Sequence, residues 1–253
     1  MMMTLGAQLF TLRDYCKTLD SFSETLKKVA DIGYKDVQVS GTCAFEADWL
    51  AEQLEKNGLT CSITHTNPNK IILETEKVIA DHNTFHCDYI GIGSLPGSVE
   101  NYFNFREDIR TAAHKIAAAD KTLMIHNHHR EFERSGPEQL NFLEYFMRDF
   151  TEQEVGFTFD TYWAQYAGAD PAYWIEKMTG RLGCVHLKDM QVVNGEQKMA
   201  PVGSGNMNFE RILAACEKAG TKHLLVEQDN CNGVDPFICL KRSYQYLTAL
   251  GLK

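Results

Sequence analysis

The sequence Val185-His186-Leu187-Lys188-Asp189-Met190 joins a short apolar run to side chains that can bind a metal ion and move protons. Three further segments share this design, in which apolar residues lead directly into histidines or carboxylates. They are residues 125–131, 157–161 and 225–229. We predict that the four segments converge on one metal site.

Short apolar runs alternate with amphipathic segments along the chain, which is typical of parallel strands joined by helices. Eight such units predict an α/β fold, a (β/α)₈ TIM barrel, and a barrel of this size is commonly one domain. We therefore expect residues 1–253 to form a single domain. The predicted strands are 5–10, 36–40, 60–65, 87–93, 122–127, 155–160, 183–187 and 223–228.

Capping and turn residues indicate where the helices begin and end. Ser21 and Glu24 are expected to form a capping box that starts the first helix, and Gly33 is expected to end it. Pro137 suits the first turn of a helix that runs to about residue 149. A polar loop is expected up to residue 205. Further helices are expected at 46–57, 99–119 and 208–219, and Gly58 is expected to end the first of these. Asp170-Pro171 and Asp235-Pro236 are expected to cap two more helices, and Ser94-Leu95-Pro96-Gly97 is an expected connection.

Composition excludes several classes of protein. The net charge of -9 and the absence of a basic run argue against binding to a nucleic-acid backbone, which needs clustered Lys and Arg. The eight cysteines contain no Cys-x-x-Cys pair and are interpreted as reduced thiols. No apolar run approaches the roughly 20 residues that span a bilayer, and the first ten residues do not resemble a signal peptide. We expect a cytoplasmic protein with no membrane partner, and homo-oligomerisation is left open.

Functional residues of a TIM barrel lie where strands end and the loops toward the helices begin. In this chain, polar side chains stand at the ends of all eight predicted strands, whereas the opposite strand ends carry helix stops and tight turns. A single polar residue there would be an ordinary cap, but eight together indicate a site. These residues are Gln8, Gln38, Ser40, His65, Ser94, His126 to Glu131, Asp160, His186, Lys188 and Glu227.

Carboxylates and histidines are ligands for Mn²⁺, Mg²⁺, Co²⁺ or Zn²⁺, and a carboxylate-rich set favours Mn²⁺, our first choice. Asp160, His186 and Glu227 end the sixth, seventh and eighth strands, so their side chains can meet above the barrel. The fifth strand must supply a fourth ligand. We favour Glu131, which would place carboxylates on both sides of a substrate; the alternatives are His126, His128 and Glu133.

Other residues near these ends are candidates for binding a substrate. Lys188 would point to the same face as His186 and polarise a sugar oxygen, unless it is a surface lysine. Trp163 could stack on a sugar or simply pack. The pair Gly203-x-Gly205 is weak evidence for a phosphate site and is interpreted as a turn. We assign substrate binding to Gln8, His65, His126 and Trp163, and catalytic roles to Glu131, Glu227, Lys188 and His128; His82, His86, His114 and His223 are interpreted as structural or surface residues.

At these residues the chain resembles the sugar phosphate isomerase/epimerase family, the xylose isomerase-like TIM barrels. The resemblance runs from Gln8 to the last helix. The matching motifs are His126-Asn127-His128-x-x-Glu131-Phe132, Asp160-Thr161-x-Trp163, Ala167-Gly168-Ala169-Asp170-Pro171, His186-Leu187-Lys188-Asp189-Met190, Pro201-Val202-Gly203-x-Gly205 and Val226-Glu227-Gln228-Asp229.

The resemblance implies a divalent ion held by Glu131, Asp160, His186 and Glu227, and a small carbohydrate as the substrate. Relatives such as ketohexose 3-epimerases and hydroxypyruvate isomerase place a Glu at the very end of the fifth strand, where this chain has His126. The His-Asn-His form is more similar to inosose dehydratase-like enzymes and to enzymes acting on keto-sugars and their glycosides.

The expected reaction is proton abstraction next to a carbonyl, with Glu227 as the base and a metal stabilising the enediolate. Return of the proton by Glu131 or a nearby histidine gives isomerisation or epimerisation. Protonation of a departing hydroxyl instead makes the enzyme a lyase or dehydratase. An apurinic endonuclease, which needs a basic face, and a non-catalytic sugar-binding barrel are the rivals from other classes.

Overall fold

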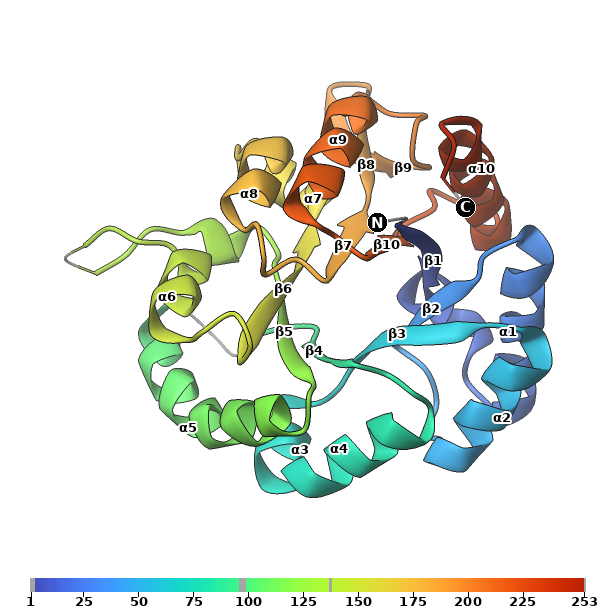
Figure 1. Cartoon of the computed structure of the whole chain (residues 1–253). Helices are drawn as coiled ribbons and strands as arrows, with labels where there is room; N and C mark the ends of the chain where they lie inside the picture. Colours follow the sequence, from blue (N-terminus) through green and yellow to red (C-terminus); the bar gives the residue numbers. More distant parts are fainter. Residues whose placement is uncertain (1–2, 96–98, 137, 253) are drawn as a thin grey trace.

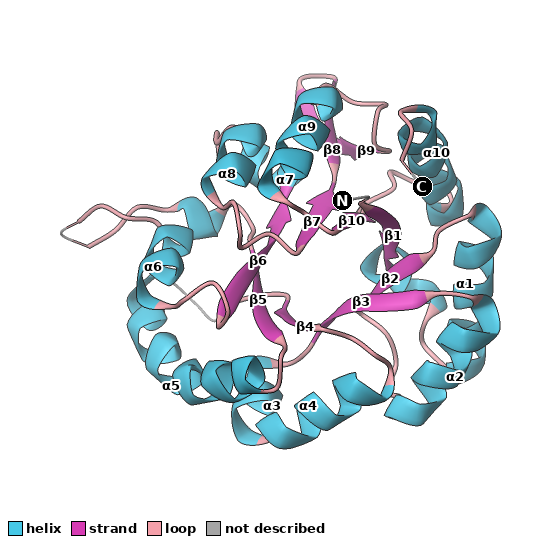
Figure 2. Ribbon diagram, in the orientation of Figure 1, coloured by secondary structure: helices cyan, strands magenta, loops and turns pink. Residues whose placement is uncertain are grey.

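The computed structural model describes residues 3–95, 99–136 and 138–252, which form a closed barrel of parallel strands surrounded by helices (Figure 1, Figure 2). The strand order β1-β10-β7-β6-β5-β4-β3-β2 closes on itself because β1 pairs with both β10 and β2. The predicted single-domain (β/α)₈ barrel is confirmed. Its strands are β1 (Thr4–Gln8), β2 (Asp36–Val39), β3 (Thr60–His65), β4 (Tyr89–Ile92), β5 (Thr122–His126), β6 (Val155–Asp160), β7 (Cys184–Leu187) and β10 (His223–Val226).

The connections between strands contain one helix or two, and the caps that start them are local. Asp170 and Asp235 cap helices that have Pro in the first turn, and Gly33 and Gly58 end helices with positive φ, all as predicted. The helices are α1 (Leu19–Ile32), α2 (Ala47–Asn57), α3 (Pro68–Leu73), α4 (Thr75–Thr84), α5 (Val99–Ala118), α6 (Phe142–Asp149), α7 (Thr161–Tyr166), α8 (Pro171–Lys177), α9 (Phe209–Ala219) and α10 (Pro236–Ala249), with 3₁₀ turns η1 (Leu9–Tyr15) and η2 (Arg130–Phe132).

Two predicted helix starts are wrong. Thr18, not Ser21, begins α1: the Thr18 hydroxyl accepts from the Ser21 backbone N–H, and the Ser21 hydroxyl accepts from the Thr18 N–H. Asn141 begins α6 through a capping box with Glu144, because the preceding residues form a small turn instead. The predicted first-turn role of Pro137 and the connection through Pro96 and Gly97 lie outside the described residues.

The expected polar loop before residue 205 is also wrong, because it contains an antiparallel hairpin. The strands β8 (Asp189–Val193) and β9 (Glu196–Ala200) pair across a turn at Asn194 and Gly195, both of which have positive φ. Asn-Gly between strand-forming residues is a recognised hairpin signal, so the hairpin was predictable from the sequence. Figure 1 labels the hairpin strands β8 and β9, and β8 contacts helix α7.

The alternation of side chains along each strand places the site. One face of each strand joins the large core against the helices, as Val185 and Leu187 do. The other face points into the barrel, where a small apolar cluster fills the interior. That cluster is Ile63, Met124, Cys184 and Leu225, and the residues two positions further along are His65, His126, His186 and Glu227. Because strand side chains repeat every two residues, these polar groups form the next inward layer.

The four histidines that were interpreted as structural or surface residues have such positions. His82 is 3% exposed; its Nδ1 lies 2.7 Å from the Val78 carbonyl oxygen and its Nε2 lies 2.9 Å from the Thr64 hydroxyl. His223 pairs with Asp36, and His86 and His114 are exposed. All eight cysteines are free thiols. Among the described residues, no helix is both long and apolar enough to cross a bilayer.

His82 makes stability depend on pH. Burial lowers the pKa of His82 from 6.5 to about 4, although its hydrogen bond to Val78 opposes the shift. The unfolded chain therefore binds this proton more readily, and stability is lost as the pH falls from about 6.5 toward 4. We expect His82 to cost about 2 kcal/mol at pH 5 relative to pH 8.

Urea unfolding of wild type and His82→Gln at both pH values measures this loss. The variant should show a shallower pH dependence, while His86→Gln, at an exposed position in the turn after α4, should match the wild type. An identical pH dependence in His82→Gln and wild type would show that His82 does not control it.

Candidate metal centre

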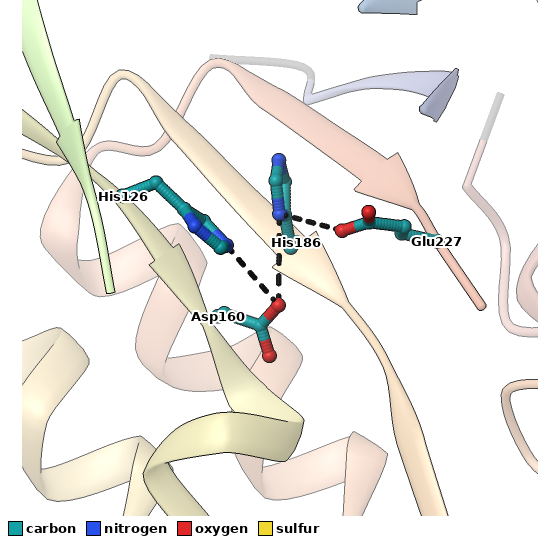
Figure 3. Close-up of side chains that lie close together, drawn as sticks. All are labelled: His126, Asp160, His186 and Glu227. Carbon is teal, nitrogen blue, oxygen red and sulfur yellow. Dashed lines mark hydrogen bonds and ion pairs between the residues drawn. The ribbon is translucent and has the colours of Figure 1, made fainter. Parts of the chain in front are cut away.

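Four buried side chains meet above the apolar interior of the barrel, at the ends of four neighbouring strands (Figure 3). His126 ends β5, Asp160 ends β6, His186 lies in β7 and Glu227 directly follows β10. One nitrogen or oxygen atom from each lies within 4.8 Å of the others. Sequence analysis brought three of these residues together and favoured Glu131 as the fourth, with His126 as an alternative; in the structure His126 completes the group.

The two histidines are oriented by bonds on their outer nitrogens. His126 Nδ1 lies 3.0 Å from the Gly93 carbonyl oxygen, and His186 Nε2 lies 2.5 Å from Gln38 Oε1. Both partners are acceptors in these pairs, so each outer nitrogen carries the proton. The inner nitrogens, His126 Nε2 and His186 Nδ1, are then left with lone pairs that face the cluster. This is the usual arrangement of histidines that ligate metals.

The two carboxylates are held in the same way. Asp160 Oδ1 accepts from the Trp163 backbone N–H at 3.0 Å, and Glu227 Oε1 accepts from Gln8 Nε2 at 2.8 Å. The other oxygens, Asp160 Oδ2 and Glu227 Oε2, face the histidines. Asn127 fixes the end of β6 further by accepting from the Asp160 N–H at 2.9 Å. Each of the four side chains thus directs one possible metal-ligand atom inward.

These donors fit a divalent transition metal. His186 Nδ1 lies 2.9 Å from Glu227 Oε2 and 3.6 Å from Asp160 Oδ2, while His126 Nε2 lies 3.3 Å from Asp160 Oδ2. Donors bound to one ion at about 2.1 Å are separated by about 3 to 4 Å. His186 Nδ1 and Glu227 Oε2 are buried yet form no well-directed hydrogen bond, as expected of atoms placed for an ion.

Lys188 supplies the balancing positive charge. Its side chain is 2% exposed, and its ammonium group lies 3.0 to 3.1 Å from oxygens of Asp160, Glu227 and Asp229, so the alternative of a surface lysine is wrong. Burial alone would raise the pKa of Asp160 and of Glu227, but the Lys188 ammonium holds both well below their usual values. The same carboxylates raise the pKa of Lys188 against the effect of burial.

Asp229 is the carboxylate that remains outside the four-residue group. Burial and the negative charge of Glu227 raise the pKa of Asp229 to about 7, although Lys188 opposes the shift. Its backbone carbonyl accepts from Arg13 at 3.0 Å, which fixes the loop after β10. Sequence analysis quoted Asp229 without giving it a role, since nothing in the local pattern shows that Lys188 reaches it.

Glu131, our predicted fourth ligand, lies outside the group. The chain leaves β5 after His126 and turns through η2, so the Glu131 carboxylate accepts from the backbone N–H of His128 at 2.7 Å. It also lies 3.4 Å from the Arg130 guanidinium. The carboxylate is buried in a local turn, where it fixes the loop that carries His128.

The remaining predicted residues surround the cluster. A cavity of about 410 Å³ opens beside it and is lined in part by Gln8, His65, His126 and His128. Gln8 reaches this space while holding Glu227. His65 Nδ1 lies 3.0 Å from the Ser40 hydroxyl, and its Nε2 is buried without a partner among the described residues. Burial lowers the pKa of His65 well below 6.5 and that of His128 to about 3.

Trp163 lies at the edge of the site and packs against other aromatic rings. Its ring centroid is 5.5 Å from that of His128 and 5.3 Å from that of His129, and the Lys188 ammonium lies 5.8 Å above it. Its indole N–H is buried without a partner among the described residues. Trp163 is not among the residues that line the cavity. Its stacking on a sugar therefore stays a prediction.

Asp189 organises the loop beyond β7. Its carboxylate is 1% exposed and accepts from the backbone N–H groups of Met190, Gly203, Gly205 and Met207 at 2.8 to 3.3 Å. The predicted turn at the two glycines is therefore confirmed. A Cβ atom at Gly205 would lie 2.5 Å from Asp189 Oδ1, so only glycine allows this approach.

Residues 26–238 match the family model of the xylose isomerase-like TIM barrel. The chain belongs to this family. The match spans all four strands that carry the cluster, in agreement with the resemblance read from the motifs. No curated protein matches the sequence significantly.

Several solved structures share the fold of this chain at low sequence identity. A sugar phosphate isomerase/epimerase from Parabacteroides distasonis ATCC 8503 is 22% identical, with a TM-score of 0.81 over 98% of this chain and 94% of that one. An L-ribulose 3-epimerase is 16% identical, with a TM-score of 0.75 over 99% and 95%. The probable 3-DHS dehydratase AsbF from Bacillus anthracis is 14% identical, with a TM-score of 0.73 over 97% and 99%.

The fourth ligand can be tested by measuring Mn²⁺ binding. Replacing His126 by Ala removes an inward nitrogen and should weaken Mn²⁺ at least about hundredfold, since even residues behind the ligands contribute tenfold to hundredfold. Glu131→Gln keeps the hydrogen bond to the His128 N–H and should bind Mn²⁺ like the wild type. Isothermal titration calorimetry gives both affinities. The reverse ranking would restore Glu131 as the ligand.

Gln38 can be tested as the residue that orients His186. Gln38→Leu removes the acceptor of the His186 Nε2–H and should weaken Mn²⁺ about tenfold to hundredfold, because the ring loses its fixed tautomer. Gln53→Leu, at a buried glutamine on α2, is the matched control. Equal Mn²⁺ affinities for the two variants would contradict the assigned role.

Proposed function

We propose that this chain is a divalent-metal-dependent isomerase or epimerase of a sugar or keto-sugar. The observation that carries the proposal is the inward set of His126, Asp160, His186 and Glu227, in which every outer atom is held by the protein. Membership of the xylose isomerase-like TIM barrels and the names of the structural relatives support a small carbohydrate substrate. Mn²⁺ is the proposed metal.

When bound, the ion would supply Lewis-acid stabilisation of the adjacent oxygens of an enediolate. Glu227 would remove the proton next to the carbonyl. Its Oε1 is held by Gln8 and retains a lone pair for that proton, while Oε2 faces the cluster. The Lys188 ammonium holds the pKa of Glu227 below its usual value against the effect of burial, so the carboxylate is ionised before it accepts the proton.

Lys188 and His128 are the proposed acid and orienting groups. Lys188 lines the cavity with a charged ammonium group, which suits a negative oxygen on the substrate. His128 also lines the cavity, and its Nδ1 is buried without a partner among the described residues. We propose that His128 exchanges a proton with the substrate, in the place we had predicted for Glu131.

The same arrangement supports a lyase as the second candidate. Glu131 is turned into its own loop, so it does not supply a carboxylate base from β5. His128, which the proposal puts in the place of Glu131, would then protonate a departing hydroxyl or other leaving group. A relative named as a probable dehydratase has the same fold. The two candidates share the first proton transfer and differ in the fate of the enediolate.

Deuterium exchange tests the shared step. In D₂O, the Mn²⁺-loaded protein should replace the proton next to the carbonyl of a keto-sugar or inosose by deuterium. Proton NMR measures the loss of that proton's signal. Glu227→Gln should slow this exchange about 10²- to 10⁴-fold. Glu133→Gln, at an exposed carboxylate near the same rim, is the matched control.

The products separate the two candidates. An isomeric sugar indicates isomerisation or epimerisation, and an unsaturated product that absorbs ultraviolet light indicates elimination. Glu227→Gln with full exchange and unchanged metal content would exclude Glu227 as the base. A purified protein that binds no divalent metal would overturn the proposal as a whole.

A further inference from the structure

Asp229 lies beside the metal centre but outside the group of four possible ligands. It follows Glu227 by two residues in the loop after β10, and it lines the same cavity as Glu227 and Lys188. Its side chain is 23% exposed, whereas that of Glu227 is 4% exposed. The proposed chemistry uses Glu227 as the base and Lys188 as the cation, so it leaves this third carboxylate without a role.

The loop that carries Asp229 is fixed by the 3₁₀ turn η1. The Thr11 hydroxyl accepts from the Gln228 backbone N–H at 2.9 Å, and the Arg13 guanidinium donates to the Asp229 backbone carbonyl at 3.0 Å. Both contacts end on backbone atoms of the loop. The position of residue 229 is therefore set without the help of its own side chain.

The ammonium group of Lys188 is not fixed by its backbone alone. The Lys188 N–H donates to the Thr161 hydroxyl at 3.0 Å, which holds the start of the side chain. Lysine carries its charge on a flexible four-carbon stem, so the tip needs contacts of its own. The Trp163 ring, 5.8 Å from the ammonium, bounds one side, and three carboxylates surround the rest.

The three carboxylate contacts of Lys188 are not equivalent. The ammonium donates a directed hydrogen bond to Asp229 Oδ2 at 3.0 Å. Glu227 Oε2 lies at the same distance but accepts no well-directed hydrogen bond, and Asp160 Oδ2 lies 3.1 Å away as an ion pair. The directed bond thus holds the ammonium toward Asp229, at the edge of the cluster.

A divalent ion and Lys188 would need the same two oxygens. Asp160 Oδ2 and Glu227 Oε2 are directed into the cluster, and both also contact the ammonium. Like charges that share ligands in a buried site repel strongly, because the local dielectric constant is low. Three carboxylates balance one ammonium and one divalent ion, whereas Asp160 and Glu227 alone would leave an excess positive charge.

We propose that Asp229 is a positioning residue that holds the Lys188 ammonium beside the metal centre, so that Lys188 and a divalent ion can share Asp160 and Glu227. The inference rests on the proposed function for the divalent metal and adds a residue to that site. Asp229 acts through Lys188 and is not itself a ligand. When the directed bond is lost, the ammonium moves onto the two inward oxygens and competes with the ion.

Mn²⁺ titrations of single and double variants test whether Asp229 acts through Lys188. Asp229→Asn keeps the size of the side chain and removes its charge. It should weaken Mn²⁺ about tenfold or more, in the range found for residues behind metal ligands. The double variant with Asp229→Asn and Lys188→Met should bind Mn²⁺ at least as tightly as the wild type, because the competing cation is gone. Isothermal titration calorimetry on the full chain gives all the affinities.

Asp14→Asn is the matched control for the loss of one negative charge. Asp14 lies on η1, its side chain is 78% exposed, and it pairs with Lys17. This variant should bind Mn²⁺ like the wild type, because solvent and salt screen an exposed charge. Thermal melting shows whether each variant is folded. Lys188→Gln replaces Lys188→Met if the double variant is unfolded, since an uncharged amide can still donate a hydrogen bond to the buried carboxylates.

Three results would overturn the inference. They are an unchanged Mn²⁺ affinity in Asp229→Asn, an equal loss in Asp14→Asn, and a loss in Asp229→Asn that the substitution of Lys188 does not restore. The last result would make Asp229 a ligand, or a charge that attracts the ion directly.

The failure of this inference is distinguishable from the failure of the proposed function. A protein that binds Mn²⁺ and exchanges deuterium into a keto-sugar, but shows no rescue, loses this inference and keeps the proposed function. Rescue without deuterium exchange keeps the role of Asp229 and contradicts the proposed reaction. A wild type that binds no Mn²⁺ overturns both.

Discussion

Two carboxylates buried inside the barrel are the constraint on which the site depends. Asp160 and Glu227 are 0% and 4% exposed, and a buried charge is costly unless nearby groups of opposite charge and hydrogen-bond donors compensate it. Lys188 contacts the inward oxygens of both. The outward oxygens are satisfied by Gln8 and by the start of α7. Strands that are far apart in the sequence must therefore close into one barrel before either carboxylate is tolerated.

Strand alternation explains why so much of this arrangement was readable from the sequence. His126, His186 and Glu227 each stand two positions beyond a residue of the apolar interior, so period two alone directs them to the same space. The inward direction of Lys188 was harder to predict because β7 ends at Leu187. It is preserved because the Lys188 N–H donates to the Thr161 hydroxyl at 3.0 Å.

The choice of Glu131 over His126 shows where sequence reasoning failed. The two-residue repeat of side chains along a strand favoured His126 as the ligand, whereas the preference for a second carboxylate favoured Glu131. The deciding fact is the path of the chain after β5, where η2 folds Glu131 back onto the His128 N–H. The contacts of Asp189 were equally hidden, because its farthest backbone partner, Met207, lies 18 residues away. Such contacts depend on loop conformations, which no local pattern specifies.

Asp160 has two roles, and each depends on the other because both use the same carboxylate. One of its oxygens faces the metal centre, and the other caps helix α7, which is only six residues long. A short helix frays easily, because few of its backbone bonds are internal. The cap restrains the carboxylate's rotation only while α7 is folded. Amide hydrogen exchange at Trp163 would therefore report on the order of the metal centre itself, from a backbone group that is not a ligand.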